Sequence, residues 1–101
     1  MKTVFQMSER FGSFLSDGEI ANQFRFTEVE PALAKRHEIV LDFSGVTNMT
    51  SAFCNTLVAS LIARHETEFN AAVRFANCDA AVEELIRAAI TLGRREASEF
   101  A

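Results

Sequence analysis

Several common sequence features are scarce in this chain of 101 residues. One Pro, four Gly and a charged fraction of 24% argue against disorder. Cys54 and Cys78 lie far apart, and no pair of histidines has metal-site spacing, so we expect reduced thiols, no bound metal and no redox motif. The longest apolar runs are too short for a membrane span or a secretory signal, so we expect a cytoplasmic protein that does not enter a membrane.

Positive charge is also in short supply. The chain has 10 Lys and Arg residues against 14 Asp and Glu residues, which gives a formal net charge of −4. Binding to nucleic-acid phosphates needs a concentrated basic surface. We therefore expect no nucleic-acid partner.

Sequence motifs of enzymes are missing as well. The chain contains no dinucleotide-binding glycine motif, no Walker loop and no nucleophile elbow, and the segment that begins at His65 lacks the second His of a zinc protease. The pairs Asp17/Glu19 and Glu28/Glu30 lie where helix starts favour acidic residues in any case. We predict a protein that is not an enzyme, with no catalytic residues and no cofactor.

Core-forming residues, in contrast, are plentiful. Hydrophobic residues make up 49% of the chain and include ten Phe, enough for one domain over residues 1–101. We expect its core to span about residues 3–93. Gly93 is a natural stop for a last helix, and residues 94–101 are expected to form a frayed tail.

Three segments have the pattern of β-strands. Residues 3–7 are expected to form an edge strand, residues 38–43 a central strand buried on both faces, and residues 72–76 a third strand with Val73 and Phe75 on one face. Residues 8–16 between the first strand and the first helix are expected to form a loop whose Phe side chains anchor it to the core.

Helical patterns separate these strands. Ser16 and Glu19 fit a capping box at the start of a first helix, and Pro31 predicts either a kink in it or two short helices. Apolar residues from 54 to 62 fall on one helical stripe that ends at His65, and Asn77 or Asp79 can cap a final helix. Alternating strands and helices predict an α/β domain with parallel strands.

The loop of residues 44–51 is the best candidate for a functional site. It follows the carboxyl end of the central strand, where ligands and modifications are common in α/β proteins. Thr50 or Ser51 can cap the next helix, and capping alone is a sufficient reason for these hydroxyl groups.

Two neighbouring residues have two interpretations each. Cys54 lies in the first turn of a helix, where the pKa of a thiol can be lowered and the thiol reactive, or it is a small core residue on the apolar stripe. Phe53 lies off that stripe, so it is either a partly exposed anchor for a partner or packed under the neighbouring loop.

The central stretch also resembles a known family. Its motifs are an aliphatic strand that ends in residues 41–43 (Leu-Asp-Phe), a Gly-Val loop at residues 45–46, and the turn of residues 49–53 (Met-Thr-Ser-Ala-Phe). They resemble STAS domains, and above all a compact prokaryotic STAS-like family of unknown function, over most of residues 15–92. The resemblance implies a single-domain STAS-like α/β fold: a small mixed β-sheet with helices packed against it, in β-α-β-α-β-α order.

The resemblance further implies a signalling role for the loop. In anti-sigma-factor antagonists of the STAS type the turn reads Asp-Ser-Ser-Gly, and its second serine is the usual acceptor of phosphate from a histidine-kinase-like ATPase. That serine corresponds to Ala52, so the switch is lost, was never used, or has moved to Ser51 or Thr50. We expect an interaction surface for a histidine-kinase-like ATPase or an anti-sigma-type regulator, formed by Asn48, Met49, Thr50, Ser51, Phe53, Asn55 and Thr56.

Two other functions remain open at this point. The helix start between Asn48 and Cys54 could bind a small ligand or an anion instead. The edge strand of residues 3–7 could pair between two copies of the chain and form a homodimer.

Overall fold

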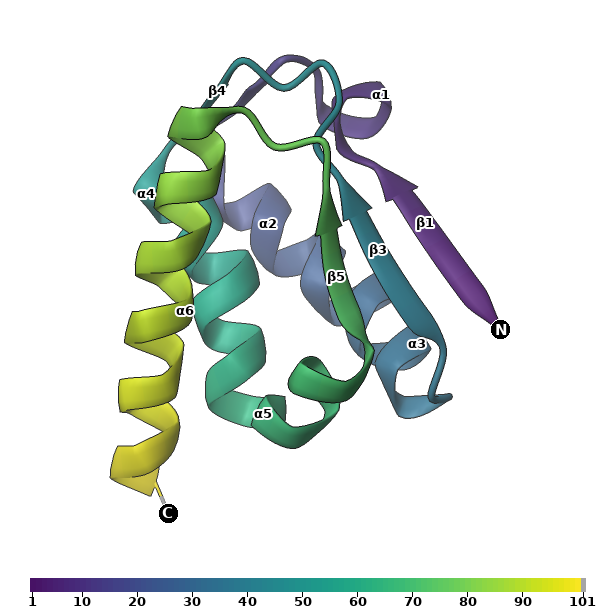
Figure 1. The fold of residues 1–101 in the computed structure, drawn as a ribbon, viewed down its shortest axis with the longest axis vertical. Coiled ribbons are helices and arrows are strands. Elements are labelled where there is room, and N and C mark those ends of the chain that lie inside the picture. Colours follow the sequence, from purple (N-terminus) through teal and green to yellow (C-terminus); the bar gives the residue numbers. More distant parts are fainter. Residues whose placement is uncertain (101) are drawn as a thin grey trace.

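Three parallel strands form the sheet of the protein (Figure 1). The computed structural model describes residues 1–100. Strand β3 (Glu38–Asp42) lies in the centre, between β1 (Lys2–Gln6) and β5 (Val73–Ala76). A second pair of short parallel strands, β2 (Phe14–Leu15) and β4 (Asn48–Met49), lies beside the carboxyl end of this sheet. The predicted α/β class and the edge position of β1 are confirmed, while self-association through that edge stays a prediction.

The sheet is covered by helices on one face only. Phe5, Ile39 and Leu41 point into the helical layer and are buried, whereas Val4 is 45% exposed and Val40 is half-buried on the other face. The prediction that the central strand is buried on both faces is therefore wrong. Right-handed crossovers that always advance in the same direction across a sheet place every helix on the same face.

The prediction of a mixed sheet is also wrong, because every strand pair is parallel. Each connection between neighbouring strands of the main sheet contains helices. Such a crossover returns the chain to the end of the sheet where the previous strand began, so the next strand runs in the same direction. The chain thus keeps the expected alternation of strands and helices, with the β2–β4 pair added to it.

The first crossover contains a continuous helical path. After the short helix α1 (Met7–Phe11), the path consists of α2 (Gly18–Phe24), the π-helical turn η1 (Arg25–Val29) and α3 (Glu30–Ala34). Asp17, not the predicted Ser16, is the cap, since its carboxylate accepts hydrogen bonds from the N–H groups of Glu19 and Ile20.

Pro31 causes no break in this helical path. The N–H of Glu30 donates to the carbonyl of Arg25, so the turn before Pro31 is one residue wider than an α-helical turn. Proline has no N–H and its ring collides with a carbonyl of the preceding turn in a regular helix. The wider turn, in place of a sharp kink or two separate helices, accommodates Pro31 between residues with helical backbone angles.

The second crossover also contains a π-helical turn. It consists of α4 (Ser51–Cys54), the turn η2 (Asn55–Ala59) and α5 (Ser60–Ala72). The predicted apolar stripe is confirmed, because its residues from position 54 to position 62 are buried: Cys54, Leu57, Val58, Leu61 and Ile62. At His65 the backbone leaves helical geometry, with φ −141° and ψ 48°, and the last part of α5 changes direction.

A buried arginine joins the two π-helical turns. Arg25 is 4% exposed, and its guanidinium donates to the carbonyl of Thr56 (2.6 Å), to the side chain of Asn22 (2.8 Å) and to the carboxylate of Glu30 (2.8 Å). A buried charge is tolerated only when it is paired and hydrogen-bonded. Arg25 therefore fixes the two helical paths against each other.

The final helix is longer than predicted. Asp79 caps α6 (Ala80–Phe100) by accepting from the N–H of Val82 at 2.8 Å, so of the two predicted caps it is Asp79 that serves. Gly93 does not end this helix: a Cβ atom at this position would lie 2.8 Å from the carbonyl oxygen of Ala59 and from Ile62. Gly93 lets α6 approach the second crossover closely, and residues 94–100 continue the helix in place of the predicted tail.

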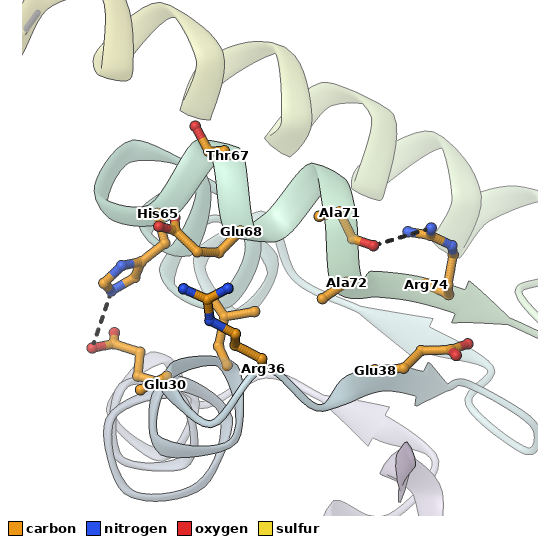
Figure 2. A pocket seen from close by; sticks show the side chains of 11 residues that line it. Glu30, Arg36, Glu38, His65, Thr67, Glu68, Ala71, Ala72 and Arg74 are labelled. Carbon is orange, nitrogen blue, oxygen red and sulfur yellow. Dashed lines mark hydrogen bonds and ion pairs between the residues drawn. The ribbon is translucent and has the colours of Figure 1, made fainter. Parts of the chain in front are cut away.

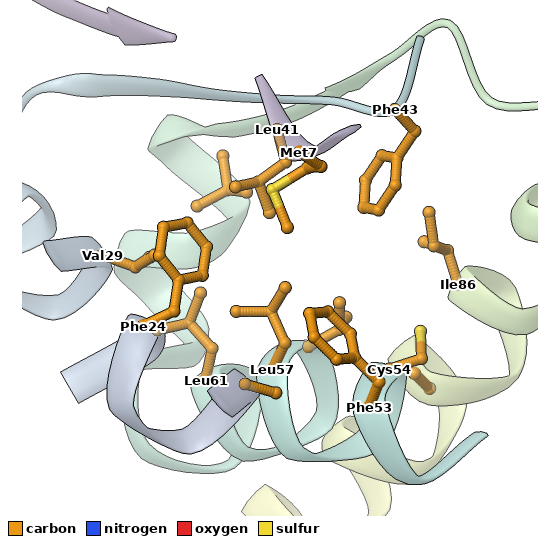
Figure 3. Close-up of a cluster of buried hydrophobic side chains, with 14 of the residues drawn as sticks. Met7, Phe24, Val29, Leu41, Phe43, Phe53, Cys54, Leu57, Leu61 and Ile86 are labelled. Carbon is orange, nitrogen blue, oxygen red and sulfur yellow. The ribbon is translucent and has the colours of Figure 1, made fainter. Parts of the chain in front are cut away.

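The hydrophobic core lies between the sheet and the helices (Figure 3). Phe43, Phe53 and Leu57 meet there with Met7 from α1, and Ile86 closes the side toward α6. Within residues 1–100, no helix is both long enough and apolar enough to cross a membrane.

The contacts of Arg25 lead to a stability prediction. Arg25→Ala removes the closer partner of the Glu30 carboxylate and leaves only His65, at 3.7 Å, so we expect a loss of about 3–5 kcal/mol in the free energy of unfolding, measured in urea. The control is Arg87→Ala, which removes the exposed ion pair with Glu83 and should cost less than about 1 kcal/mol. Equal losses in both variants would contradict the assigned role of Arg25.

Candidate functional site

Asp42 organises the carboxyl edge of the sheet. Its carboxylate accepts hydrogen bonds from the side chain of Asn77 (3.0 Å) and the N–H of Ser44 (2.9 Å). These bonds favour the charged form, so they lower the pKa of Asp42, with the Asn77 bond contributing most. Asp42 thus holds the end of β3, the loop after it and the residue that follows β5.

The loop after β3 packs against residues near the N-terminus. The hydroxyl of Ser8 donates to the carbonyl of Ser44 (2.7 Å), and the N–H of Thr47 donates to the carbonyl of Ser13 (2.9 Å). Gly45 has φ +82°, and a Cβ atom there would lie 2.9 Å from the Ser8 hydroxyl. Glycine suits such a position because it lacks a Cβ atom.

Thr50 is the cap of the helix that follows this loop. Its hydroxyl accepts from the N–H of Phe53 (3.1 Å) and donates to the carbonyl of Ser16 (3.2 Å), while its own N–H donates to Leu15 (2.9 Å). The choice between Thr50 and Ser51 as the cap is therefore decided for Thr50. Its hydroxyl already donates one hydrogen bond and accepts another, so it is not free to accept a phosphate.

Ser51 has the opposite surroundings. Its side chain is exposed at the first position of α4 and has no hydrogen-bond partner within the described part of the chain. The N–H groups of Ser51 and Ala52 also lack a protein acceptor there, as is usual in the first turn of a helix. Of the two candidate phosphoacceptors, Ser51 is the accessible one.

Two residues of the predicted interaction surface are buried. Met49 is part of the core, and Phe53 is 1% exposed with its ring centre 5.9 Å from that of Phe11. Figure 3 shows the Phe53 ring directed into the core. The interpretation of Phe53 as an exposed anchor is therefore wrong: its ring is buried and packs against Phe11 of the short helix α1. Asn48 is exposed, while Asn55 and Thr56 are half-buried.

Two exposed apolar residues beside the turn were not predicted. Phe14 is 52% exposed and lies opposite Asn48 in the β2–β4 pair, whereas the sequence pattern assigned it to the core. Ile20 is 42% exposed in the first turn of α2, and that turn lies beside α4, since Gly18 faces the carbonyl of Ala52. A strand of only two residues gives no sequence pattern that would reveal Phe14 as exposed.

These side chains form one group, which we name the turn surface. Segments far apart in the sequence contribute to it: β2 and the start of α2 on one side, β4 and the start of the second crossover on the other. Its residues are Phe14, Ile20, Asn48, Ser51, Asn55 and Thr56.

Cys54 is not a reactive thiol. It is 1% exposed in the core, and burial raises the pKa of its thiol to about 12, with a smaller contribution from Cys78. The interpretation of Cys54 as a core residue is therefore correct. The side chain faces the sheet with the rest of the apolar stripe, away from the solvent at the helix start (Figure 3).

This difference leads to a labelling prediction. At about pH 8, iodoacetamide should modify the half-buried Cys78 of the native protein well before Cys54, which should react only after unfolding in urea. Mass spectrometry of tryptic peptides measures both rates. Similar rates at the two cysteines in the native state would mean that Cys54 is accessible.

Comparison with protein-family models gives a match over the middle of the chain. A family model described as a STAS-like domain of unknown function matches residues 21–83. Neither the comparison with curated proteins nor that with solved structures gives a match. The matched residues include most of the first crossover helix, the whole of the second, the central strand and the turn that carries Ser51, and they make up more than half of the chain. The chain thus belongs to the family of STAS-like domains of unknown function.

Proposed function

We propose that this protein is a non-enzymatic regulatory module that binds a protein partner through the turn surface. The observation that carries this proposal is the free, exposed hydroxyl of Ser51, three residues after Asn48, which lies opposite the exposed Phe14 in the β2–β4 pair. Aromatic side chains are enriched in protein interfaces, whose rims are polar. Family resemblance suggests a histidine-kinase-like ATPase or an anti-sigma-type regulator as the partner.

Phosphorylation of Ser51 would be the regulatory event. A phosphate adds nearly two negative charges at neutral pH, and it would lie at the start of the helical path from Ser51 to Ala72. The nearby N–H groups of Ser51 and Ala52 are free to donate to its oxygens, and the helix dipole favours a negative charge there. Ser51 thus offers the chemistry that Ala52 cannot provide.

The same phosphate would weaken binding of the partner. A partner that covers the turn surface must remove water from its polar groups, including Ser51. Removing water from a dianion is far more costly than removing it from a hydroxyl group. The unphosphorylated protein would therefore be the form that binds.

A phosphorylation assay tests this switch. The chain is incubated with labelled ATP and the histidine-kinase-like ATPase encoded nearest to it. We expect label on the wild type, none on Ser51→Ala, and full labelling of the control Ser98→Ala, since Ser98 is an exposed residue of α6. Labelling of Ser51→Ala to the wild-type level would overturn the role of Ser51. If the wild type takes up no label but still binds the ATPase, the phosphorylation switch is ruled out, and the proposal that the protein is a binding module remains.

A binding assay tests the turn surface itself. Phe14→Ala should weaken binding of the same ATPase at least about tenfold, because the exposed aromatic ring provides apolar contact area on the turn surface. Phe26→Ala is the matched control, since Phe26 is 67% exposed in η1, two helical turns from the start of α2, and should leave the affinity unchanged. Surface plasmon resonance measures both affinities. If only Phe26→Ala lowers the affinity, the partner binds at η1 and not at the turn surface.

A further inference from the structure

A cavity of about 740 Å³ opens at the amino ends of β3 and β5, at the opposite end of the strands from Ser51 (Figure 2). It lies between α3 with the loop that follows it and the second half of α5. This volume is in the range of small-molecule sites in proteins. Leu33, Ala34, Ala71 and Ala72 give the cavity an apolar lining, and charged side chains surround it.

Arg36 occupies a backbone position that favours glycine. It has φ +61° at the end of α3, its N–H donates to the carbonyl of Leu33, and the N–H of His37 donates to the carbonyl of Ala32. This pair of bonds is the Schellman arrangement, in which the left-handed residue is usually Gly. A side chain with a Cβ atom is unfavourable there, so an arginine at this position indicates a role for its guanidinium group.

The guanidinium of Arg36 points into the cavity (Figure 2). No acceptor for it is found among residues 1–100, neither a carboxylate nor a carbonyl. A planar group with several N–H donors is suited to bind a carboxylate through two parallel hydrogen bonds. The arginine is thus placed to bind an anionic group from outside the chain.

The opposite wall of the cavity is built around the irregular backbone at His65. The imidazole Nε2 lies 3.7 Å from a carboxylate oxygen of Glu30, whose other oxygen accepts from the buried Arg25. Glu30 is therefore already neutralised by Arg25. Glu68, one turn further along α5, has no ion-pair or hydrogen-bond partner within the described residues, and its side chain reaches toward the same space (Figure 2).

The remaining charged groups lie at the far end of the cavity. Arg74 donates to the carbonyls of Asn70, Ala71 and Val73. Its guanidinium thus satisfies carbonyl groups at the carboxyl end of α5. Glu38 lies on the same side as Arg74, away from Arg36 (Figure 2). The carboxylate of Glu38 also has no ion-pair or hydrogen-bond partner within residues 1–100, but it lies away from Arg36 (Figure 2). Between the two walls, the charged groups without a partner are the exposed side chains of Arg36 and Glu68.

We propose that this cavity binds a small zwitterionic ligand of the amino-acid type. Arg36 would bind the carboxylate, Glu68 would bind the ammonium group, and the apolar lining at Ala71 and Ala72 would contact the ligand's side chain. A ligand with only a negative charge would meet the carboxylate of Glu68, and a ligand with only a positive charge would meet Arg36. A zwitterion satisfies both groups, so it is the class that fits this arrangement of charges.

The test uses glycine, leucine and phenylalanine as probes of the whole chain. Amide NMR shifts in residues 30–38 and 65–74 should change on titration up to about 10 mM, with leucine and phenylalanine bound more tightly than glycine because of the apolar lining. N-acetyl-leucine lacks the ammonium group and leucinamide lacks the carboxylate, so both should bind at least about tenfold more weakly than leucine. Shifts with none of the three amino acids, or N-acetyl-leucine bound as tightly as leucine, would overturn the proposal.

Two variants separate binding from stability. Arg36→Gly relieves the left-handed backbone, so its melting temperature should stay equal or rise while binding falls at least about tenfold. Glu68→Gln keeps the shape of the side chain and should cause a similar loss of affinity. Arg94→Gln on the exposed side of α6 is the control and should bind as the wild type does. Unchanged affinity in folded Arg36→Gly would overturn the proposal. The amino-acid affinities of these variants do not depend on Ser51, so this test is independent of the phosphorylation assay.

Discussion

The buried guanidinium of Arg25 is the contact on which the arrangement of the helices depends. It joins the two crossovers at their π-helical turns, where the carbonyl of Thr56 accepts one of its hydrogen bonds. At one end of this helix pair the starts of α2 and α4 lie side by side and carry Ser51. At the other end Glu30, paired with Arg25, forms part of the wall of the cavity. The buried arginine thus lies on the helix pair that joins the two candidate sites.

The one-sided sheet follows from topology. Strands that always advance in the same direction through right-handed crossovers place all helices on one face, and the other face stays open to solvent. Parallel sheets are usually covered on both faces. In this small domain the whole core lies on one side, and this explains why Gly93 must let α6 approach the second crossover so closely.

Local sequence patterns predicted most of the elements. The β-branched runs marked β3 and β5, and the apolar stripe from Cys54 to Ile62 marked the second crossover helix, because side-chain periodicity reports which side of an element is buried. The motif around the turn also pointed to the family that the comparison then identified. Patterns were less informative at helix ends: the cap moved from Ser16 to Asp17, and Gly93 lies inside a helix.

The sequence by itself determined the α/β class, the strands, the helical faces and the presence of a hydroxyl-rich turn. Only the tertiary structure decided which hydroxyl is free, since Thr50 is engaged by Ser16 from a distant segment and Ser51 is not. It also decided that Phe53 is buried and Phe14 exposed, and that Arg36 and Glu68 face one cavity. Periodicity depends on neighbours along the chain, whereas these properties depend on contacts between segments that only folding brings together.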